Sequence, residues 1–158
     1  MTRTWTGAVC AVAVAAAVGG LVTALDDYAV PAGPFARSAA CTDVVGRLPE
    51  RLLGRDRDAV EGAGAAGWGG GAVILRCGVR PPAPTVDTCM NVNGVDWVLD
   101  DERAKRGDGW VFTVYGTDPA VEVSFKESRQ LAGDALVAVG GSLGGLVRKS
   151  RCLALSDT

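Results

Sequence analysis

The chain contains no histidine among its 158 residues. Histidine is the commonest general base and the central member of most catalytic triads, so its absence excludes every active site that depends on it. No two cysteines form a CxxC pair. This spacing disfavours both a structural zinc site and a dithiol redox centre. We therefore expect no metal and no other cofactor.

An excess of positive charge is also missing. The chain has 16 basic and 18 acidic residues, for a net charge of −2. Affinity for DNA or RNA comes largely from neutralising phosphates, so this balance argues against a nucleic-acid partner. The chain also lacks the polybasic cluster that binds anionic lipid. Contact with a membrane must therefore depend on an apolar segment.

One long apolar run is present at residues 5–25, and it contains no charged residue. A helix of this length spans about 31 Å at 1.5 Å per residue, which is close to the thickness of a bilayer core. Arg3 precedes the run and two aspartates follow it, so the positive-inside rule predicts that everything after the run lies outside the cytoplasm. We expect residues 1–25 to be a signal anchor in the cell membrane. The alternative is a signal peptide cleaved near Ala24, which would release a secreted protein.

The rest of the chain divides into a linker and one domain. Residues 26–40 are rich in proline, alanine and glycine without periodicity, which is typical of a flexible tether. Residues 41–158 are enough for one domain and contain four of the five cysteines. Paired cysteines in a small domain are typical of proteins outside the cytoplasm.

Apolar and polar residues alternate in four segments, as in strands with one buried face. These segments are 72–79, 93–99, 110–115 and 120–125. Helical spacing relates Val44, Val45, Leu48 and Leu52, and it recurs over 131–147. We expect an α+β fold, with an antiparallel meander of about four strands, an N-terminal and a C-terminal helix packed on one face, and two disulfides. The charged segment 100–109 is expected to be a loop.

A strand register can be tested for consistency. If Cys77 lies opposite Val95, then Arg76 lies opposite Asp96 on the other face. Apolar residues then face one another, and opposite charges pair across the two strands. This register predicts that Asp96 is a solvent-exposed partner of Arg76 rather than a catalytic acid.

The four cysteines of the domain are Cys41, Cys77, Cys89 and Cys152, and they allow three pairings. Cys77 and Cys89 are joined by a short proline-rich segment, whereas Cys41 and Cys152 bracket the domain. The nested pairing, Cys77–Cys89 with Cys41–Cys152, is the simplest of the three and is our expectation.

Few residues are candidates for a binding site. Residues 62–67 match GxGxxG, but the strand and helix that a dinucleotide site requires do not flank them. Trp68 and Tyr115 have the chemistry to line a carbohydrate groove, although strand aromatics more often pack in a core. Together with Arg76 and Asp96, they are the candidate binding residues. No pair of carboxylates stands out by its spacing as a catalytic pair.

Several blocks of sequence resemble an actinobacterial family, domain-of-unknown-function family 3515. The matching residues are Cys41, Leu48-Pro49, Leu52, Gly54, Trp68-Gly69, Leu75-Arg76-Cys77-Gly78-Val79, Cys89, Gly94-Val95-Asp96-Trp97, Phe112-Thr113-Val114-Tyr115-Gly116, Pro119-Ala120-Val121 and Cys152. The resemblance covers residues 41–152, and it implies a small exported or membrane-anchored protein. It implies no catalytic residue.

Two functional hypotheses follow. The first is a non-catalytic envelope module that binds or scaffolds an envelope protein or a glycan, held at the membrane by residues 5–25. The alternative is a small envelope hydrolase or glycan-acting enzyme that uses carboxylates. A concave pocket with two carboxylates of raised pKa would favour the enzyme. An exposed apolar patch on a convex surface would favour the binding module.

Overall fold

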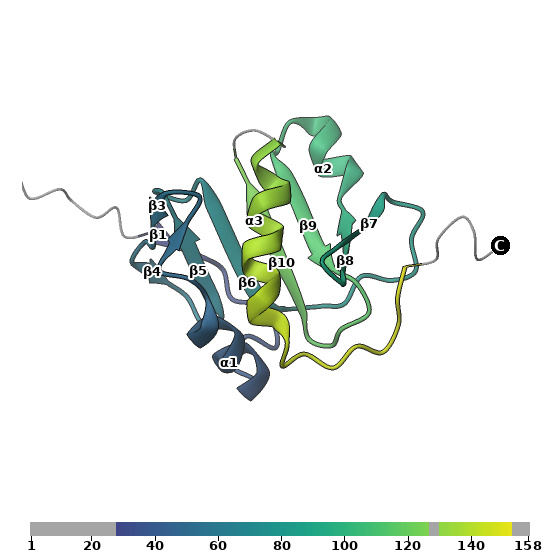
Figure 1. The fold of residues 1–158 in the computed structure, drawn as a ribbon, viewed down its shortest axis with the longest axis horizontal. Helices are drawn as coiled ribbons and strands as arrows, with labels where there is room; N and C mark the ends of the chain where they lie inside the picture. Colours follow the sequence, from purple (N-terminus) through teal and green to yellow (C-terminus); the bar gives the residue numbers. More distant parts are fainter. Residues whose placement is uncertain (1–27, 127–129, 153–158) are drawn as a thin grey trace, which may run out of the picture.

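The computed structural model describes residues 28–126 and 130–152. Its centre is a six-stranded antiparallel sheet with the strand order β5-β6-β10-β9-β8-β7 (Figure 1). In that order the strands are Ala65–Trp68, Val73–Val79, Ala120–Phe125, Trp110–Val114, Val95–Leu99 and Cys89–Val92. The four strands expected from alternation are β6, β8, β9 and β10, so the α+β class and the antiparallel sheet are confirmed.

The sheet is not the simple meander that we expected. Strands β7 to β10 form a meander, but β6 lies beside β10 and never contacts β8 as a ladder partner. Cys77 is opposite Val121 rather than Val95, and Arg76 is opposite Glu122. The predicted register between β6 and β8 is therefore wrong.

A local hairpin explains the difference. Asn93 and Gly94 form a two-residue turn between β7 and β8, with φ angles of 46° and 82°. An Asn-Gly turn with both residues at positive φ favours a tight hairpin, and β7 thereby occupies one edge of β8. Strand β9 occupies the other edge, which leaves no place for β6.

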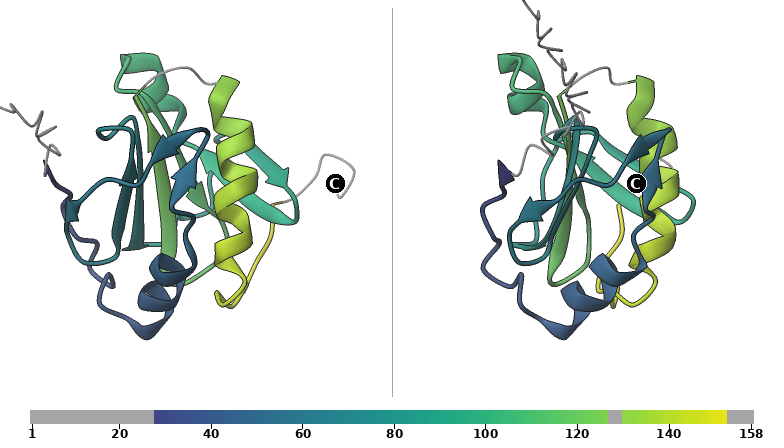
Figure 2. Two further views of the ribbon diagram at one scale, coloured as in Figure 1. Left: turned by 60° about the vertical axis from the view of Figure 1, so that its left-hand side comes forward. Right: turned by 90° about the vertical axis from the view of Figure 1, so that its left-hand side faces the viewer.

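One face of the sheet carries the hydrophobic core. Figure 2 shows α3 (Gln130–Gly140) alongside this face, and α1 (Ala39–Arg47) contributes to the same core from the end of the sheet. Trp68 and Trp97 are fully buried in it. The predicted helix over 131–147 is shorter than expected, because a 3₁₀ turn at Gly141–Leu143 and two further glycines replace its last turns. Each glycine inside a helix lowers the stability of that helix by about 1 kcal/mol relative to alanine.

Segment 100–109 contains a helix where we expected a loop. Helix α2 spans Asp101–Arg106, and the side chain of Asp100 caps it by accepting a hydrogen bond of 2.9 Å from the Arg103 amide. Gly107 ends the helix in the left-handed conformation. Acidic residues in the first turn and basic residues in the last complement the helix dipole.

The described part of the predicted tether is not free of the domain. Strand β1 (Tyr28–Ala29) pairs in parallel with β4 (Val60–Glu61), and Val30 is buried. The segment then runs along the sheet face opposite α3 (Figure 2). The Phe35 amide donates to the Gly78 carbonyl at 2.9 Å, in a contact so close that a Cβ at Gly78 would collide with the backbone. The folded domain therefore includes residues 28–40.

A small hairpin, β2 (Arg51–Leu52) with β3 (Arg55–Asp56), completes the fold. Among the residues that the structure describes, no helix is long and apolar enough to cross a bilayer. The run 5–25 and the anchor predicted there lie outside the described residues.

Candidate functional site

The two disulfides are Cys41–Cys77 and Cys89–Cys152, with Cα–Cα separations of 5.4 and 6.3 Å. The nested pairing that we expected is wrong. Cys77 lies on β6 and Cys89 on β7, and three strands separate them. At about 4.8 Å per strand step the two residues are roughly 19 Å apart. A disulfide requires Cα atoms within about 7 Å, so sheet order excludes that pair.

Asp96 is buried, with 5% of its surface exposed, and it does not contact Arg76. Its carboxylate accepts a hydrogen bond of 2.6 Å from the Asn91 side-chain amide and one of 3.0 Å from the backbone amide of Cys152. The prediction of a surface ion pair is therefore wrong. Asp96 instead joins the β7–β8 hairpin to the C-terminal end of the domain.

We call residues 144–152 the C-terminal strap, because they cross the end of the sheet and finish at a disulfide. The Lys149 amide donates to the Gly116 carbonyl at 2.6 Å, and the Lys149 ammonium pairs with Asp118 at 3.1 Å. A Cβ at Gly116 would collide with the Ser150 carbonyl oxygen. The close packing at Gly116 fixes the path of the strap.

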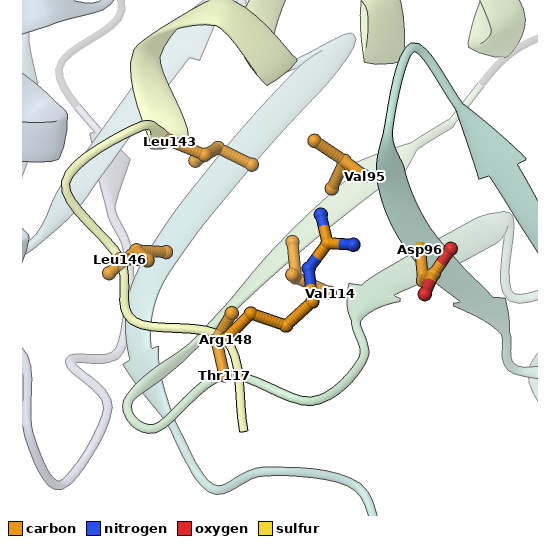
Figure 3. Close-up of a pocket in the computed structure, with 7 residues that line it drawn as sticks. All are labelled: Val95, Asp96, Val114, Thr117, Leu143, Leu146 and Arg148. Atoms are coloured by element: carbon orange, nitrogen blue, oxygen red, sulfur yellow. The ribbon is translucent and has the colours of Figure 1, made fainter. Parts of the chain in front are cut away.

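A small pocket lies between the strap and the core, and we call it the inner pocket (Figure 3). It is lined by Val95, Asp96, Val114, Thr117, Leu143, Leu146 and Arg148, and its volume is about 40 Å³. Figure 3 shows the Arg148 guanidinium between the two leucines on one side and Val95 and Asp96 on the other. The Thr117 hydroxyl is buried and has no hydrogen-bond partner among the described residues. A pocket of this size accommodates a few water molecules but no organic ligand.

A larger cleft lies around the second disulfide, and we call it the outer cleft. It is lined by Pro84, Thr85, Val86, Asp87, Cys89, Val98, Tyr115, Arg151 and Cys152, and its volume is about 390 Å³. Trp97 and Leu99 belong to the core, so Val98 between them points to the opposite face of the sheet. The outer cleft is therefore on the face away from α3, and its volume suits a small ligand.

Polar side chains in the outer cleft are available to a ligand. Arg151 makes no ion pair with another described residue, and the Asp87 carboxylate makes none either. The half-buried Tyr115 contributes an aromatic ring and a hydroxyl that is not engaged in a hydrogen bond within the described part of the chain. Of the four candidate binding residues, Tyr115 alone lines this cleft.

Trp68 and Arg76 have structural roles. Trp68 is fully buried, and its indole N–H donates to the Pro49 carbonyl at 3.0 Å. Arg76 donates to the Pro31 carbonyl at 3.0 Å and pairs with Glu122 at 3.1 Å. Arg76 thus holds the N-terminal segment against the sheet, and neither residue lines the outer cleft.

A cluster of polar groups around Asp58 was not apparent from the sequence. The Tyr28 hydroxyl donates to Asp58 at 2.8 Å, and the amides of Gly70 and Gly71 donate to the same carboxylate at 2.9 Å. Burial acts to raise the pKa of Asp58, but the amide and hydroxyl hydrogen bonds outweigh it and the pKa is lowered. Burial, aided by Asp58, raises the pKa of Tyr28. This cluster fastens β1 to the glycine-rich turn before β6.

Neither the inner pocket nor the outer cleft contains two carboxylates, and no group of three or more possible metal ligands occurs within residues 28–126 and 130–152. Residues 62–67 lead from β4 into β5, and no helix follows them as a dinucleotide site requires.

Comparison with known proteins identifies a family. The family described as "Protein of unknown function (DUF3515)" matches residues 6–146. The chain shows no significant similarity to a curated protein or to a solved structure.

Proposed function

The chain belongs to the DUF3515 family, and we propose that it is an exported, membrane-anchored envelope protein whose domain binds a partner without catalysing a reaction. In this proposal residues 5–25 are the anchor, and the disulfide-linked domain lies outside the cytoplasm. The partner is an envelope protein or a glycan. Cleavage near Ala24, with release of the domain, is the alternative for the N-terminus.

The observation that carries this proposal is the pair of disulfides. They close loops with sequence separations of 36 and 63 residues. In the chain-entropy account, loops of this length each contribute about 4 kcal/mol of stability, provided that the thiols stay oxidised. Disulfides persist outside the reducing cytoplasm, so dependence of the domain's stability on them supports the proposal that it is exported.

The outer cleft supports binding rather than catalysis. It combines one carboxylate, one guanidinium and one phenol, from Asp87, Arg151 and Tyr115. Hydrolysis of a glycosidic bond by carboxylates requires two of them on either side of the scissile bond. The single carboxylate of this cleft favours recognition of a ligand.

Export is tested with reporter fusions after Thr158. A reporter that is active only in the cytoplasm should be silent, and one that requires an oxidising compartment should be active. The reverse pattern would overturn the proposed location.

Binding is tested by photo-crosslinking in cells. Val86 is fully exposed at the rim of the outer cleft, and Val137 is exposed on α3, on the other face of the sheet. A photoreactive residue at Val86 should yield a crosslinked partner, whereas the same residue at Val137 should not. Equal labelling from both positions would contradict a partner site at this cleft.

A further inference from the structure

We infer that the outer cleft is a binding site for a neutral carbohydrate. This inference rests on the proposed function and specifies its ligand class. The cleft presents an aromatic ring, an apolar floor, a hydrogen-bond donor and a hydrogen-bond acceptor in one concavity of about 390 Å³. A sugar ring offers the matching surfaces, with C–H groups on its faces and hydroxyls around its edge.

The apolar part of the cleft comes from the sheet and the disulfide. Val98 lies on β8, and the Cys89–Cys152 bridge lies beside it on β7. Tyr115 follows β9, and its backbone amide donates to the Asp96 carbonyl at 2.8 Å, so the base of this side chain is held by the sheet. An aromatic ring with a polar tip packs against an apolar face while its hydroxyl contacts polar groups.

The polar part of the cleft carries one charge of each sign, so it gives no net preference for an anion or a cation. The Arg151 guanidinium only donates hydrogen bonds, whereas the Asp87 carboxylate only accepts them. An anion would be attracted by Arg151 but repelled by Asp87, and a cation the reverse, so neither kind of ion gains from both side chains. A hydroxyl group both donates and accepts, so a neutral ligand with several hydroxyls satisfies both side chains at once.

The walls of the cleft are held in place before a ligand arrives. The Asp87 amide donates to the Thr85 hydroxyl at 3.1 Å, and the Thr88 amide and hydroxyl donate to Asp101 at 3.3 and 3.2 Å. On the other side of the cleft, the Cys152 amide donates a hydrogen bond of 3.0 Å to the buried Asp96 carboxylate. Preorganised walls reduce the ordering cost of binding, which matters for a small ligand with modest contact area.

The test uses the full chain purified in detergent under oxidising conditions. Its probes are neutral tetrasaccharides of glucose, mannose and N-acetylglucosamine, with a sulfated oligosaccharide for comparison. Affinity is measured for the unaltered chain and for Tyr115→Ala and Arg151→Met. Arg37→Met is the matched control, because Arg37 is an exposed arginine outside the cleft.

We expect at least one neutral tetrasaccharide to bind, and the Tyr115→Ala and Arg151→Met substitutions each to weaken binding by about tenfold or more. Arg37→Met should leave the affinity unchanged, and thermal melts should show that all variants are folded. The inference is overturned if no neutral probe binds the folded chain. It is equally overturned if the sulfated probe binds more tightly or if the cleft variants bind as well as the control.

Failure of this inference is distinguishable from failure of the proposed function. A protein crosslinked from Val86, together with no binding of any tetrasaccharide, would leave an exported binding module whose ligand is a protein. A cytoplasmic domain in the reporter assay would overturn the proposed function itself.

Discussion

The buried carboxylate of Asp96 is the most informative residue to perturb. It accepts hydrogen bonds from the Asn91 side chain at 2.6 Å and the Cys152 amide at 3.0 Å, with 5% of the residue exposed. A hydrogen bond to a charged group contributes about 1.5–3 kcal/mol. Asn91 is exposed and can bond to water after the acceptor is lost. We therefore expect Asp96→Ala to lower the free energy of unfolding by about 2–4 kcal/mol.

Asp96→Asn tests the same contact with a smaller change in side-chain shape. Its amide has one acceptor oxygen, whereas two donors point at the site. Asn91 could rotate its amide to present its oxygen, but that oxygen already accepts a hydrogen bond of 3.0 Å from the Gly94 amide. We expect Asp96→Asn to cost about 1–2 kcal/mol, in contrast to the near-neutral effect that the surface prediction implied.

The assay is thermal unfolding of the oxidised chain, in which each kcal/mol shifts Tm by about 3–5 °C for a domain of this size. Asp134→Asn on α3 is the matched control, because Asp134 is exposed and its change should stay within about 0.5 kcal/mol. The reasoning is refuted if Asp96→Ala and Asp134→Asn melt at the same temperature, because the Cys152 amide would then have lost its buried acceptor at no cost.

Three further predictions concern cross-links, pH and packing. Peptide mapping without reduction should recover the Cys89–Cys152 pair, and Cys89→Ser should lower stability by about 4 kcal/mol. Asp58 has a lowered pKa, so its contribution is present above the unfolded-state pKa of about 4 and is lost as the pH falls through the folded-state value. Thermal melts from about pH 2 to 7 should therefore show that acid lowers the stability of Asp58→Asn less than that of the unaltered chain. Gly116→Ala should destabilise more than Gly70→Ala, because both have positive φ but only Gly116 lacks room for a Cβ; equal melts would contradict this.

The sequence contained signals for two features that our expectations missed. Asp100 and Gly107 are the capping residues of α2, and the charge order between them matches the helix dipole. Asn93-Gly94 is a strong hairpin signal, and it would have paired β8 with β7. Both signals are local, so residues within a few positions of one another were sufficient to reveal them.

The second partner of Asp96, the Cys152 amide, could not be found from such local signals. The donor from Cys152 is 56 positions away in the chain. Its position depends on the path of the C-terminal strap, which in turn depends on contacts at Gly116. The outer cleft has the same origin, because Tyr115, Asp87 and Arg151 come together from a strand end, a loop and the strap. Among the candidate binding residues, composition identified Tyr115 but not its neighbours.

By itself the sequence determined the local elements: strands β6, β8, β9 and β10 through alternation, the C-terminal helix through its spacing, and a family through its motifs. Only the tertiary structure decided which strands are neighbours. Once β10 lies between β6 and β9, Cys77 is too far from Cys89 to bond with it, and Asp96 is removed from Arg76. Alternation fixes the face to which a side chain points, because the strand repeat is two residues. It carries no information about the neighbouring strand, which is selected by packing and loop closure over the whole chain.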